Sequence, residues 1–96
     1  MPEMHFTIRW PDGEEARCYS PSLIVREYLE IGREYPVEEF VGKSREMLGI
    51  ASERVKAKYG YYCSAAMDQL STIEARAGVF SKTELVRVLG FEPKDA

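Results

Sequence analysis

The stretch from Ala51 to Leu70, ASERVKAKYGYYCSAAMDQL, decides the fold of this chain. Its pattern is typical of the end of one long helix, a tight aromatic corner and the start of a second helix. Gly60 can end the first helix in the left-handed conformation, and Ser64 can cap the second helix. Because the corner is short, we expect the two helices to pack antiparallel as a helical hairpin.

The two helices of this hairpin each have an apolar stripe at helical spacing. The first is predicted to begin with Pro36 at its first position and to end near Lys58. Its inward stripe is expected to be Val37, Phe40, Val41, Ser44, Leu48, Ala51 and Val55. The second helix is expected to turn Met67, Leu70, Ile73 and Ala77 inward.

Two glycines, Gly42 and Gly49, lie together off the inward stripe of the long helix. Each costs about 1 kcal/mol relative to alanine in a helix interior. They are either two tolerated surface glycines or the mark of a close backbone approach by another element or another subunit.

Residues 4–10 alternate apolar and polar side chains, as in a half-buried strand. Pro11, Asp12 and Gly13 follow, and this order predicts a type I turn with Gly13 in the left-handed conformation. A second strand then returns beside the first. The expected cross-strand pairs are Phe6 with Cys18, Ile8 with Ala16 and Arg9 with Glu15.

Two further segments complete the predicted fold. Ser20 is expected to cap a short helix that has Pro21 at its first position and ends by Gly32. A capping-box pattern at 81–84 precedes a run rich in β-branched residues at 85–89, so helix and strand both remain open for residues 82–89, and we favour a strand. The chain is therefore predicted to be α+β, with a small antiparallel sheet packed on one face by a short helix and the helical hairpin.

Composition limits the classes of function. The 96 residues, with 45% apolar and 30% charged side chains, predict a single domain over 1–96. A net charge of −3 argues against nucleic-acid and anionic-membrane partners, which select for Lys and Arg. No apolar run can span a membrane and the first residues do not form a secretion signal, so a cytoplasmic location is expected.

The two cysteines, Cys18 and Cys63, are too few for a disulfide framework and lack the spacing of zinc ligands. We expect no metal and no cofactor. The predicted register points Cys18 and the single histidine, His5, to opposite sheet faces, which argues against a dyad. Cys63 precedes a helix start and follows a basic turn, two features that lower a thiol pKa, so it is the candidate nucleophile. The alternative is a buried structural thiol.

The same corner contains the candidate ligand-binding residues. Cations and aromatic rings in one turn can hold a phosphate or stack a base. The candidates are Arg54, Lys58, Tyr59, Tyr62 and Ser64. The alternative interpretation is that the cations complement the helix dipole and that the three tyrosines, Tyr59, Tyr61 and Tyr62, belong to the core.

Six short segments carry a likeness to a known family. They are MPEM (1–4), WPDG (10–13), CYSPS (18–22), YPV (35–37), ASERV (51–55), and YG with CS (59–60 and 63–64). Together they resemble a bacterial family of small nitrogen-starvation-response proteins, over nearly the whole chain. That family is encoded in a cluster centred on a nitrilase, with a radical SAM protein, an acetyltransferase-like protein and a flavoprotein. The resemblance implies a pathway of nitrile or cyanide nitrogen assimilation, not an activity.

Three functional hypotheses follow. The first is a non-catalytic accessory protein that binds enzymes of the nitrilase-associated cluster. The second is a small thiol-dependent enzyme or ligand-binding module that uses Cys63 and Arg54. The third, the weakest, is a nucleic-acid-binding regulator. We also expect a homodimer, because Leu85 and Leu89 would emerge on the uncovered face of a tail strand.

Overall fold

The chain begins with the predicted β-hairpin, formed by β1 (Met4–Arg9) and β2 (Glu15–Ser20). In the computed structural model, which describes residues 3–61 and 64–92, the strands pair in the predicted register, with Phe6 opposite Cys18. Gly13 has a φ of 91°, as the predicted turn requires. The hairpin prediction is confirmed.

Two more strands extend the sheet on the β1 side. The tail forms β4 (Leu85–Glu92), which confirms a strand there but places it three residues later than the predicted segment. A short strand, β3 (Glu34–Pro36), pairs with the start of β4 and was not predicted. The sheet is antiparallel, in the order β2-β1-β4-β3. The expected start of the long helix is therefore corrected, because Pro36 is the last residue of β3 and the first helical residue is Val37.

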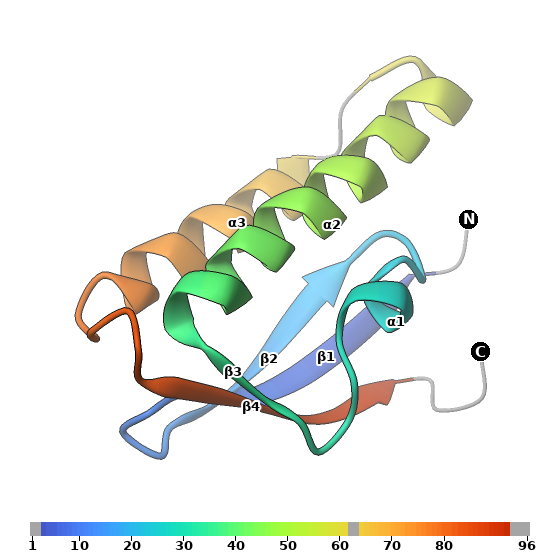
Figure 1. The fold of residues 1–96 in the computed structure, drawn as a ribbon. Coiled ribbons are helices and arrows are strands. Elements are labelled where there is room, and N and C mark those ends of the chain that lie inside the picture. Colours follow the sequence, from blue (N-terminus) through green and yellow to red (C-terminus); the bar gives the residue numbers. More distant parts are fainter. Residues whose placement is uncertain (1–2, 62–63, 93–96) are drawn as a thin grey trace.

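The helical hairpin covers one face of this sheet (Figure 1). Its long helix, α2 (Val37–Tyr59), ends at Gly60 with a φ of 84°, in the predicted left-handed cap. The second helix, α3 (Ser64–Ala77), runs back antiparallel beside it (Figure 1). The predicted α+β fold is confirmed, with both long helices on the same side of four strands.

The short helix begins later than predicted. Helix α1 spans only Val25–Tyr28, and Ser20 is the last residue of β2. The serine hydroxyls are used in local turns instead, since Ser20 Oγ accepts the N–H of Ser22, and Ser22 Oγ accepts the N–H of Ile24. These bonds offer the backbone an alternative to a helix and delay its start.

The core lies between the sheet and the two long helices. Of the predicted inward stripe of α2, all members are buried except Val41, which is half-buried. The prediction for Met67 is wrong, because this side chain is 36% exposed. Helix α3 instead packs through Ala66, Ile73 and Ala77, whose 3.6-residue spacing leaves Met67 at the margin.

Candidate functional site

The cations predicted to form a ligand site at the end of α2 point to different neighbours. Arg54 Nη1 donates a hydrogen bond to the hydroxyl of Ser22, in the turn that follows β2, at 2.8 Å. Lys58 places its Nζ 5.5 Å from the centre of the Tyr59 ring. Arg54 and Lys58 therefore do not converge on a common point.

The tyrosines of this corner lie on the surface. Tyr59 is 50% exposed and Tyr61 is 65% exposed, with ring centres 6.2 Å apart. The interpretation of these two rings as core residues is therefore wrong. Ser64 begins α3 and is exposed. Two predicted site residues, Tyr62 and Cys63, lie outside the residues that the structure describes.

The bond between Arg54 and Ser22 is a feature that sequence reasoning missed. Ser22 is buried, and its hydroxyl oxygen accepts hydrogen bonds from the Arg54 guanidinium and from the Ile24 N–H. A charged donor makes this hydrogen bond stronger than a neutral one. The bond ties α2 to the turn before α1. The Ser20-Pro21-Ser22 sequence is also typical of a serine turn, which the expectation of a helix start at Pro21 overlooks.

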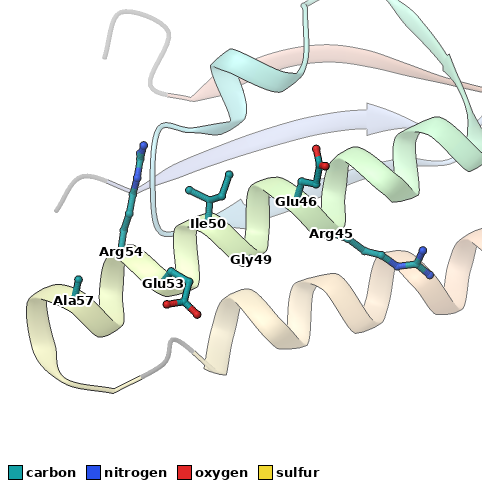
Figure 2. Close-up of a pocket in the computed structure, with 7 residues that line it drawn as sticks. All are labelled: Arg45, Glu46, Gly49, Ile50, Glu53, Arg54 and Ala57. Atoms are coloured by element: carbon teal, nitrogen blue, oxygen red, sulfur yellow. The ribbon is translucent and has the colours of Figure 1, made fainter.

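A shallow hollow of about 660 Å3 lies on the outer face of α2, above Gly49. Figure 2 shows that Glu46, Ile50 and Arg54 extend to one side of this face, while Arg45 and Glu53 extend toward α3. A Cβ at Gly49 would meet nothing within 4 Å, and the same holds at Gly42. No described element of this chain approaches either glycine, so an approach by another subunit or protein stays a prediction.

The charges around this hollow are balanced. Two acids and two arginines line it, and Arg45 also bonds Glu74 of α3 at 2.8 Å. Ile50 is half-buried and gives the hollow an apolar side. An open, nearly neutral depression on one helix offers contact area to another protein but does not enclose a small molecule.

The one described thiol is buried in the sheet. Cys18 is 2% exposed, and burial raises its pKa to about 12. His5 points to the other face, as predicted, where its ring stands edge-on to Tyr19 at 5.6 Å. Cys18 and His5 therefore form no dyad. A thiol held neutral in this way is a poor nucleophile at neutral pH.

A second cluster joins the hairpin turn to the end of α3. Arg76 bonds Asp12 and Glu14 and lies over the rings of Trp10 and Phe80, with its guanidinium carbon 5.8 Å and 4.8 Å from their centres. The Glu14 backbone N–H and then Arg76 hold the pKa of the Asp12 carboxyl below its ordinary value. Because these groups bond one another, the cluster fastens the turn and is not an open site.

The described residues lack two features that would indicate a particular class of function. Residues 3–61 and 64–92 contain no group of three or more His, Cys, Asp or Glu side chains placed to hold a metal ion. Within the same ranges, no helix has the length and apolar character needed to cross a membrane.

Comparison with known proteins gives one positive finding. Neither the curated proteins nor the solved structures include a match to this chain. A family model described as nitrogen starvation-induced protein NitG matches residues 5–91, which cover the hairpin, all three helices and nearly all of β4. The chain belongs to the NitG family of nitrogen starvation-induced proteins.

Proposed function

We propose that this protein is a non-catalytic accessory protein of a nitrilase-associated pathway, which binds an enzyme of that pathway in the cytoplasm during nitrogen starvation. Membership of a nitrogen starvation-induced family supports the physiological setting. The resemblance to a family encoded beside a nitrilase is the reason for expecting that enzyme cluster as the source of the partner.

The observation that carries the proposal is the hollow above Gly49. A missing side chain on the exposed face of a long helix lets a partner's backbone or side chain approach closely. The acids at its rim, Glu46 and Glu53, can pair with positive charges on the partner and fix its orientation. By contrast, Arg54 and Lys58, the cations predicted to hold a small ligand, are turned toward groups of their own chain.

The experiment is affinity capture from nitrogen-starved cells with a tagged chain. Gly49→Arg fills the hollow with a large side chain, and the open space around Gly49 leaves the core undisturbed. Thr83→Arg adds the same group at an exposed residue in the turn between α3 and β4, and serves as the matched control. We expect the wild type and Thr83→Arg to retain an enzyme of the nitrilase cluster, and Gly49→Arg to lose it.

The alternative, a thiol-dependent enzyme or ligand-binding module, makes a different prediction. If Cys63 and Arg54 act on a small molecule, Cys63→Ala should abolish function, whereas the proposed accessory role needs no thiol. Retention of the partner by Gly49→Arg would count against the hollow as the binding surface.

A further inference from the structure

Strand β2 forms an open edge of the sheet. It pairs with β1 on one side, and among residues 3–61 and 64–92 no further strand lies beyond it. Helix α3 packs next to this edge, and a crevice of about 200 Å3 separates them, lined by Ala16 and Arg17 of β2 and by Thr72 of α3. An edge strand with outward-facing backbone groups is a template for pairing with another strand.

The hairpin geometry shows which backbone groups face this edge. Trp10 donates to Glu14 across the turn, so residues at even positions of β2 bond to β1. The N–H of Tyr19 faces outward, where it is bound by Gln69 Oε1 at 2.9 Å. By the two-residue period of a strand, the N–H and C=O groups of Glu15 and Arg17 also face outward.

The helix beside this edge has an unusually uncharged surface. One of the seven exposed residues of α3 is charged, against eight of ten in α2. The exposed residues of α3 are Ser64, Ala65, Met67, Asp68, Ser71, Thr72 and Ala75. A second protein can therefore approach α3 without removing many charges from water.

We propose that the β2 edge binds a second copy of this chain, with the two β2 strands antiparallel and the two sheets joined into one. Outward-facing backbone groups must hydrogen-bond to outward-facing groups of the copy. Three registers are then possible: Glu15 opposite Glu15, Arg17 opposite Arg17, or Glu15 opposite Arg17. Centring the pair on Arg17 or on Glu15 places like charges opposite one another, which is destabilising. Pairing through Tyr19 is blocked, because its N–H is bound by Gln69.

The remaining register places Ala16 opposite its own copy and Glu15 opposite Arg17, twice by symmetry. Within one chain Glu15 already bonds Arg9 at 3.0 Å and Arg17 bonds Glu92 at 3.3 Å, both at the surface. The joined sheets then carry a row of charges that alternates in sign across the seam. Because Glu15 and Arg17 of one copy complement Arg17 and Glu15 of the other, a second copy fits this edge better than an unrelated extended peptide. Both α3 helices fall on the same side of the joined sheet.

Analytical ultracentrifugation over a concentration series tests the proposal. The wild type should dimerise at micromolar to submillimolar concentration, more weakly at high salt. Arg17→Glu and Glu15→Arg should each weaken the dimer by about tenfold or more, because each opposes like charges. The double variant Glu15→Arg/Arg17→Glu should restore it. Circular dichroism confirms that each variant folds.

Two further variants separate this surface from the uncovered sheet face. Arg17→Pro removes only an outward N–H, which an edge strand tolerates, and should yield a monomer. Leu85→Lys alters the uncovered face, where Leu85 is 45% exposed, and should leave the dimer intact. A wild type that stays monomeric would overturn the proposal. So would a dimer that survives both charge reversals but dissociates in Leu85→Lys.

Discussion

The buried Cys18 thiol predicts a specific loss of stability at alkaline pH. Burial raises its pKa from an ordinary 9.0 to about 12 in the folded protein. Between these two pKa values the folded state binds more protons than the unfolded state. The stability that the neutral, buried thiol contributes is therefore fully present below the unfolded pKa and is lost as pH rises toward the folded pKa. Each pH unit in this interval lowers the free energy of unfolding by about 1.4 kcal/mol. By about pH 11 the total loss is at most about 2 to 3 kcal/mol.

The assay is urea unfolding of the wild type and of Cys18→Ala, followed by circular dichroism from neutral to alkaline pH. The variant lacks only this ionisable group, so the contributions of all other groups are common to both proteins and cancel in the comparison. At neutral pH the wild type should be more stable, by about 1 kcal/mol for the lost packing. This advantage should shrink and reverse as pH rises. Parallel stability curves would refute the reasoning.

Three other predictions follow from the turns and the remaining thiol. Gly13→Val should destabilise the fold by roughly 1–2 kcal/mol, because Gly13 has a φ of 91°. Gly42→Ala should instead stabilise it by up to about 1 kcal/mol, because alanine favours a helix and the space beside Gly42 is open. Urea unfolding of the two variants measures both effects. In Arg76→Ala, an NMR titration should show the pKa of Asp12 rising only part of the way to its ordinary value, since the backbone hydrogen bond remains; an unchanged pKa would contradict the contact. In timed alkylation at neutral pH, Cys63 should react before the buried thiol, and equal inertness of the two would count against a reactive corner.

The hairpin and the long helix could be predicted because their signals are local. The Pro11-Asp12-Gly13 turn determines the register of β1 and β2, and Gly60 determines the end of α2. Both depend on backbone geometry that neighbouring residues dictate. The uncovered side of β4 was also predicted, since alternation places Leu85 outside and Val86 inside.

The missed features depend on contacts between distant parts of the chain. Strand β3 has only three residues and exists because β4 lies beside it. The late start of α1 reflects bonds from Ser20 and Ser22, and Arg54 reaches one of them from 32 residues away. Sequence spacing brought Arg54 and Lys58 together as a site, but it could not show that each side chain has a nearer partner.

The most direct test of an accessory role is complementation of nitrogen-starved cells that lack the chromosomal gene. Cys63→Ala should restore growth on a nitrile nitrogen source as well as the wild type, because the proposed role needs no nucleophile. Gly49→Arg, expressed at the same level, should fail, because it fills the hollow on α2. The opposite pattern, growth with Gly49→Arg and none with Cys63→Ala, would contradict the account.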